Sequence, residues 1–276
     1  MFCTKTMPYN HKNFATCKNG SNFASLFLVF SNTEAKIMSI NYKNVKDMDL
    51  DMKLVALGDS IIKGVLFSEE ENGHGHYSLS DLNIVDHLAN RLHCETINLG
   101  KMGSTIESGE RILDRYSDRI EGANYVLICY GGNDSDYDWN AIANYPGGEH
   151  RPKTSLSAFE KTYSRIIHKL RSAGFTPLML SLPPMNAQSY FDHFTRRFDS
   201  QQKKNVLKWL KGSVDTIWAG HELYNDAIKR VAQATNTRLI DVTSVLLRHN
   251  DYLCADGIHP NNRGYQLIAK SVLSAI

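Results

Sequence analysis

Short apolar runs alternate with segments of helical spacing along the chain from residue 52 onward. An uninterrupted apolar run of about four to eight residues is typical of a strand that is covered on both faces, as in a parallel sheet. Residues 125–130 are apolar throughout. The pattern predicts strands at residues 53–57, 94–98, 124–130, 176–182 and 237–242.

Between these runs, apolar residues recur at intervals of three and four, which indicates amphipathic helices. The apolar positions are Leu156, Phe159, Tyr163, Ile166, Ile167 and Leu170 in one segment, Tyr224, Ala227, Ile228 and Val231 in a second, and Tyr265, Ile268 and Val272 in the last. Alternation of strands and helices predicts an α/β fold with a mostly parallel five-stranded sheet and helices on both sides. Neither a repeat nor a linker interrupts this pattern, so we expect one domain over residues 52–276.

Residues 1–51 lack this alternation of apolar runs and helical segments, so we expect a poorly structured leader there. The apolar run at residues 23–30 is too short to span a bilayer. Lysines before this run and small residues after it partly match a signal peptide. The favoured interpretation is a disordered leader or a non-native start, with translation beginning at Met48 or Met52. Secretion is the alternative if the leader is a signal peptide.

Composition and charge exclude several classes of function. With 42% hydrophobic and 22% charged residues, the chain has the composition of an ordinary globular protein. A formal net charge of +2 is too small to attract nucleic acid or an anionic membrane strongly. The five cysteines are scattered without metal-ligand spacing, which favours a reducing compartment. We therefore expect a cytoplasmic protein without nucleic-acid partners or stable membrane insertion, and the oligomeric state is left open.

The sequence Gly58-Asp59-Ser60 directly follows the first predicted strand. Ligands bind at the carboxyl edge of open α/β sheets, so Ser60 is a candidate nucleophile. The alternative is a serine that only caps the following helix.

The sequence Asp256-Gly257-Ile258-His259-Pro260, just before the last predicted helix, provides a candidate base. An aspartate three residues ahead of a histidine can turn back onto the imidazole. It would then fix the Nδ1–H tautomer and leave Nε2 free to accept the proton of Ser60. The alternative is a histidine on a surface loop.

Two glycine-containing segments follow the second and third strands and could provide donors to an oxyanion. Residues 98–105 contain Gly100 and Gly103, and glycines let backbone N–H groups approach a ligand closely. In Gly131-Gly132-Asn133-Asp134, the amide of Asn133 can donate to a developing negative charge. Together with the N–H of Ser60, these segments would give donors from three strand ends.

Taken together, the four blocks resemble the SGNH hydrolases, also called the GDSL esterase/lipase family. The resemblance implies a flavodoxin-like three-layer α/β/α sandwich and hydrolysis of carboxylic esters or thioesters. It implies that Ser60 is both nucleophile and oxyanion donor, that Gly103 and Asn133 are the other donors, that His259 is the base and that Asp256 orients it. Ile61 and Ile62 stand where the family often has leucine or a small residue, which leaves these roles intact but alters the pocket wall.

Three long connections, at residues 64–80, 134–154 and 183–216, are expected to determine specificity. Candidate substrate contacts are Tyr137, Trp139 and His150, although the two aromatic residues could equally pack the loop onto the body of the protein.

We expect acyl-enzyme hydrolysis of small-acyl esters of carbohydrates or small molecules. The alternatives are a lipase, lysophospholipase or thioesterase and, more remotely, a non-catalytic binding module. The expected chemistry needs no cofactor. His74 and His76 have no third metal ligand nearby and predict a surface loop rather than a metal site.

Overall fold

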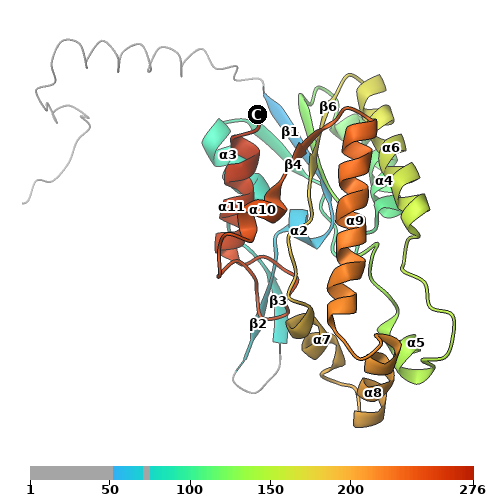
Figure 1. Ribbon diagram of the computed structural model, residues 1–276. Helices are drawn as coiled ribbons and strands as arrows, with labels where there is room; N and C mark the ends of the chain where they lie inside the picture. The colour runs from blue at the N-terminus through green and yellow to red at the C-terminus, as the bar shows by residue number, and fades with distance from the viewer. Residues whose placement is uncertain (1–51, 71–74) are drawn as a thin grey trace, which may run out of the picture. The chain divides into compact units, whose positions relative to one another are not determined.

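A five-stranded parallel sheet lies at the centre of the computed structural model, which describes residues 52–70 and 75–276 (Figure 1). The predicted leader, residues 1–51, lies outside the described residues. The strands are β1 (Lys53–Gly58), β4 (Glu95–Asn98), β5 (Tyr125–Cys129), β6 (Thr176–Leu180) and β7 (Arg238–Ile240). Their order is β4-β1-β5-β6-β7, and every neighbouring pair is parallel. All five predicted strands are confirmed, with small differences at their ends.

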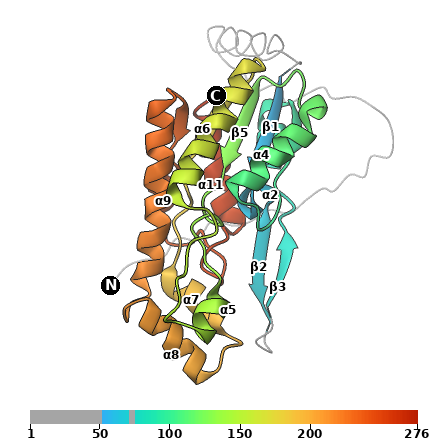
Figure 2. The same ribbon diagram turned by 90° about the vertical axis from the view of Figure 1, so that its right-hand side faces the viewer.

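Helices cover both faces of this sheet, so the predicted three-layer α/β/α fold is confirmed (Figure 2). Successive residues of a strand point to opposite faces. In β1, Val55 and Leu57 pack with α4 (Ile106–Arg115), α6 (Leu156–Ser172) and α9 (Asp215–Ala234). Leu54 and Ala56 pack on the other face with α3 (Ile84–Leu92), α10 (Val242–Leu246) and α11 (Asn262–Leu273). The three helical patterns found in the sequence correspond to α6, α9 and α11.

The connection at residues 64–80 contains an antiparallel hairpin that the sequence pattern did not predict. It follows the short helix α2 (Ser60–Lys63) and pairs β2 (Val65–Glu69) with β3 (Gly75–Leu79). Four of the five residues of β3 are exposed. A strand with so little burial has no alternation of apolar and polar positions, which explains why the pattern missed it.

The other two long connections contribute three helices that share an apolar cluster of their own. They are α5 (Trp139–Asn144), α7 (Ala187–Thr195) and α8 (Ser200–Trp209), and we call them the cap. The cap lies at the end of the molecule toward which the hairpin also points (Figures 1 and 2). In the part of the chain that the structure describes, no helix is long and apolar enough to cross a membrane.

Candidate active site

The turn from β1 to α2 explains the sequence Gly58-Asp59-Ser60 residue by residue. A Cβ atom on Gly58 would lie 2.3 Å from Ile62 Cγ1, so only glycine fits there. The carboxylate of Asp59 accepts a hydrogen bond of 2.9 Å from the backbone N–H of Ile61 and thereby caps α2. Ser60 is the first residue of this helix and lines a cavity at the carboxyl edge of the sheet.

Asp256 and His259 lie in the loop before α11, where they form a compact turn. The Nδ1 atom of His259 is 2.5 Å from Oδ2 of Asp256, and Oδ1 of Asp256 accepts hydrogen bonds of 3.2 Å from the N–H groups of Ile258 and His259. Gly257, between them, has φ of +77°, which favours glycine. The side chain of Asp256 is completely buried.

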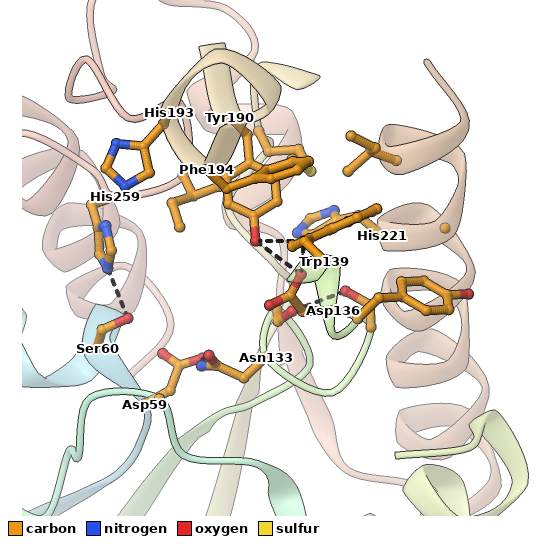
Figure 3. A pocket seen from close by; sticks show the side chains of 18 of the residues that line it. Asp59, Ser60, Asn133, Asp136, Trp139, Tyr190, His193, Phe194, His221 and His259 are labelled. Atoms are coloured by element: carbon orange, nitrogen blue, oxygen red, sulfur yellow. Dashed lines mark hydrogen bonds between the residues drawn. The ribbon is translucent and has the colours of Figure 1, made fainter. Parts of the chain in front are cut away.

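Burial acts to raise the pKa of Asp256, but the hydrogen bond and charge of His259 outweigh this effect and lower the pKa below its ordinary 3.8. The aspartate is therefore ionised at neutral pH and holds the Nδ1–H tautomer of the imidazole. The Nε2 atom of His259 is then free to accept a proton, and it lies 2.9 Å from Oγ of Ser60 (Figure 3).

Gly103 and Asn133 line the same cavity as Ser60. Gly103 has φ of +72°, which favours glycine, and no atom lies within 4 Å of the position that a Cβ would take. The amide Nδ2 of Asn133 donates a hydrogen bond of 3.2 Å to Oδ2 of Asp59. The structure therefore brings Ser60, Gly103, Asn133, Asp256 and His259 together, and their catalytic roles stay a prediction.

The cavity has a volume of about 470 Å³ and extends from Ser60 and His259 past the cap to α9 (Figure 3). Two of the three candidate substrate contacts, Tyr137 and Trp139, line this cavity. Trp139 stacks on Phe194 with ring centroids 4.5 Å apart and donates a hydrogen bond of 2.8 Å to Asp136. Trp139 thus packs the cap together, as the second interpretation expected, and its contact with a substrate stays a prediction.

His150 is not among the residues that line the cavity. Its Nε2 atom lies 2.8 Å from the carbonyl oxygen of Tyr145, and its ring meets Trp209 edge-on at 6.0 Å. The expectation that His150 touches the substrate therefore has no support from its position.

Several cavity residues were not candidate site residues in the sequence analysis, although most of them lie in the long connections that were expected to determine specificity. They come from the hairpin, the cap and α9, and are Tyr77, Tyr190, His193, Arg196, Arg197 and His221. The Tyr77 ring lies 5.6 Å from the His259 ring, and its hydroxyl is 2.9 Å from Nε2 of His193, which is 116 residues away in the chain. Only the tertiary structure brings such pairs together.

A metal site is not evident within residues 52–70 and 75–276, because no three His, Cys, Asp or Glu side chains there form a group that could hold an ion. His76 lies on β3 with its Nδ1 atom 3.6 Å from Oε1 of Glu70. His74 lies outside the described residues.

The model of the GDSL-like Lipase/Acylhydrolase family matches residues 56–267. The chain belongs to this family. This agrees with the resemblance seen in the four sequence blocks, and it makes the protein a GDSL-like hydrolase. A search of curated protein sequences found no match.

Solved structures of similar fold include other hydrolases. The lipase/acylhydrolase from Enterococcus faecalis is 21% identical, with a TM-score of 0.56 and coverage of 82% of this chain and 95% of that one. A catalytic mutant of Axe2, an acetylxylan esterase from Geobacillus stearothermophilus, is 16% identical, with a TM-score of 0.53 and coverage of 81% and 93%. TesA is 19% identical, with a TM-score of 0.52 and coverage of 81% and 97%. At these identities the likeness shows a shared fold.

Proposed function

We propose that this GDSL-like hydrolase cleaves carboxylic esters through an acyl-enzyme, with Ser60 as the nucleophile. The observation that carries the proposal is the hydrogen-bonded series from Asp256 through His259 to Ser60, which ends at the cavity. Nucleophile, base and orienting acid at hydrogen-bond distance are the arrangement that activates a serine hydroxyl.

In the proposed reaction, Nε2 of His259 takes the proton of Ser60 as Oγ attacks the ester carbonyl carbon. The resulting oxyanion accepts hydrogen bonds from the N–H groups of Ser60 and Gly103 and from the amide of Asn133. His259 then protonates the alcohol oxygen, the bond between that oxygen and the acyl carbon breaks, and the alcohol leaves. Water attacks the acyl-enzyme with His259 again as base, which releases the carboxylic acid and restores Ser60. No cofactor is needed for these steps.

The assignment predicts that Ser60→Ala abolishes hydrolysis of p-nitrophenyl acetate, because the nucleophile is removed. His259→Ala should be nearly as severe, and the double variant should lose little more, since the two residues act as a unit. Initial rates measure the effect, with Ser271→Ala on α11, outside the cavity lining, as a matched control. More than a few per cent of activity in Ser60→Ala would refute the assignment.

For the substrate we propose a small-acyl ester, such as an acetyl ester, of a carbohydrate or small molecule. The aromatic side chains of Tyr137 and Trp209 and the polar side chains of Asp136 and His221 line one cavity. Rings that stack and polar groups that hydrogen-bond suit a hydroxylated molecule. The acetylxylan esterase among the proteins of similar fold acts on a substrate of this class.

A lipase, lysophospholipase or thioesterase is the second candidate, because Leu182, Met185 and Ile217 also line the cavity. Its volume of about 470 Å³ exceeds the needs of an acetyl group alone. The two candidates predict opposite dependence of kcat/KM on acyl length in p-nitrophenyl esters. A steep fall beyond acetyl is the expected result, whereas a rise toward octanoyl would replace the first candidate with the second. Parallel assays with acyl-CoA would identify a thioesterase.

A further inference from the structure

Two arginines at the end of α7 line the cavity next to the proposed catalytic residues. Arg196 and Arg197 follow the last residue of that helix, and both are exposed to the cavity and the solvent. Within the described residues, neither arginine forms an ion pair with a carboxylate. Guanidinium groups that no described carboxylate pairs with are suited to binding an anion such as phosphate or carboxylate.

The acidic residues of the cavity wall do not neutralise these arginines, because they already have other partners. Asp136 accepts hydrogen bonds from Trp139 and Tyr190 and forms an ion pair with Lys153. Asp59 accepts hydrogen bonds from Ile61 and Asn133.

Contacts with the hairpin hold Arg196 in place. Its guanidinium carbon lies 5.7 Å from the centroid of the Phe67 ring on β2, a cation–π distance. Gly75 of β3 leaves room for this contact. A Cβ atom at Gly75 would lie 2.1 Å from the ring of Phe67 and 3.1 Å from Nη1 of Arg196. Cations also stabilise the carboxyl ends of helices, which accounts for basic residues after α7. It does not account for the contact of Arg196 with the Phe67 ring at the cavity wall.

The hydrogen bonds of His193 add a further donor to the same wall. An arginine can only donate, so Nδ1 of His193 is the acceptor in its 3.4 Å contact with Nη1 of Arg196. The imidazole proton then lies on Nε2 and is donated to the hydroxyl oxygen of Tyr77 at 2.9 Å. Burial, and next the charge of Arg196, lower the pKa of His193 and keep it neutral. The O–H of Tyr77 is therefore free to donate to a ligand.

This wall lies on the leaving-group side of the proposed reaction. The Tyr77 ring is in edge contact with His259, which in the proposed reaction protonates the departing alcohol. Tyr77, Arg196 and Arg197 all offer donors and no anionic group. Guanidinium groups bind phosphate and carboxylate with two parallel hydrogen bonds.

We propose that Tyr77, Arg196 and Arg197 form a subsite for a negatively charged leaving group, so that the enzyme prefers esters whose alcohol carries a phosphate or carboxylate. The inference rests on the proposed function, because the subsite serves the ester bond attacked by Ser60.

The test compares kcat/KM for three acetyl esters: 4-acetoxyphenyl phosphate, 4-acetoxybenzoate and the neutral methyl 4-acetoxybenzoate. In the double variant Arg196→Gln, Arg197→Gln, the ratio of anionic to neutral ester should fall about tenfold or more, which corresponds to about 1.4 kcal/mol. Comparing each ratio with that of the wild type cancels the intrinsic reactivity of the esters. A larger fall for the phosphate than for the carboxylate would indicate a phosphorylated alcohol, and the reverse a carboxylated one.

Arg91→Gln on α3, which does not line the cavity, is the matched control and should leave both ratios unchanged. The wild-type preference should also weaken as salt is raised, because exposed charges are screened. An unchanged ratio in the double variant, or equal loss of all three esters, would overturn the subsite while leaving Ser60 as the nucleophile. Hydrolysis of all three esters by Ser60→Ala would instead refute the proposed function.

Discussion

Asp59, the residue before the proposed nucleophile, joins the turn at Ser60 to the proposed oxyanion donor. Its carboxylate accepts hydrogen bonds from the N–H of Ile61 and the amide of Asn133, and only 3% of the residue is exposed. Burial raises the pKa of Asp59 from 3.8 to about 6, although both hydrogen bonds act to lower it. The ionised form therefore costs stability at neutral pH, and it holds the side chain of Asn133 at the cavity.

This raised pKa predicts how Asp59→Asn changes stability with pH. Asp59 binds a proton more tightly in the folded protein than in the unfolded chain, so protonation of Asp59 stabilises the fold. The whole of this stabilisation is present below pH 3.8, and it is lost as the pH rises to about 6. Asparagine caps a helix about as well as aspartate but does not titrate. The stability of the variant relative to wild type should therefore grow by about 1.4 kcal/mol per pH unit between pH 4 and 6.

Urea unfolding at pH 4, 5, 6 and 7 measures this difference. Asp138→Asn, at the exposed N-cap of α5, is the matched control. A stability difference for Asp59→Asn that stays constant over this range would contradict the account of the buried carboxyl.

At the scale of elements, Asp134 joins the loop after β5 to the start of α4. Thr105, the N-cap residue of α4, makes no capping hydrogen bond with its side chain. The carboxylate of Asp134 instead accepts hydrogen bonds of 3.0 and 3.2 Å from the backbone N–H of Ile106. A residue from another loop thus caps the helix that follows the proposed donor Gly103.

Asp134→Ala should lower the free energy of unfolding by about 1–3 kcal/mol, because it leaves a buried N–H without a partner. Thr105→Ala is the matched control: the half-buried threonine makes no capping hydrogen bond, so the free energy of unfolding should change by no more than about 0.5 kcal/mol. Denaturant unfolding measures both variants. Equal effects of the two substitutions would show that Asp134 does not cap α4.

The elements that the sequence predicted are those with strong apolar patterns. The core strands are continuous apolar runs, and α6, α9 and α11 carry apolar faces that fill the two cores. The hairpin and the cap helices were not predicted, because tertiary contacts rather than a local apolar pattern stabilise them. The strand β3 is largely exposed, and α5 is only six residues long.

At the scale of the whole molecule, strand order explains why the proposed catalytic residues could be predicted. The strand β1 lies between β4 and β5, so the segments that follow these three strands meet at one edge and carry Ser60, Gly103 and Asn133. On the opposite wall of the cavity, the long connections were predicted to determine specificity, but the pairs of side chains that form the wall were not predicted. Tyr77 comes from the hairpin and His193 from the cap, and no local pattern connects them.

Covalent labelling with a fluorophosphonate probe tests the central claim, that Ser60 is an activated nucleophile, most directly. Only a serine deprotonated by a base such as His259 attacks the phosphorus atom readily. We expect one label per chain, located by peptide mass spectrometry on the peptide that contains Ser60, and no label in Ser60→Ala. A folded wild-type protein that takes up no label, or a label that persists in Ser60→Ala, would contradict the account.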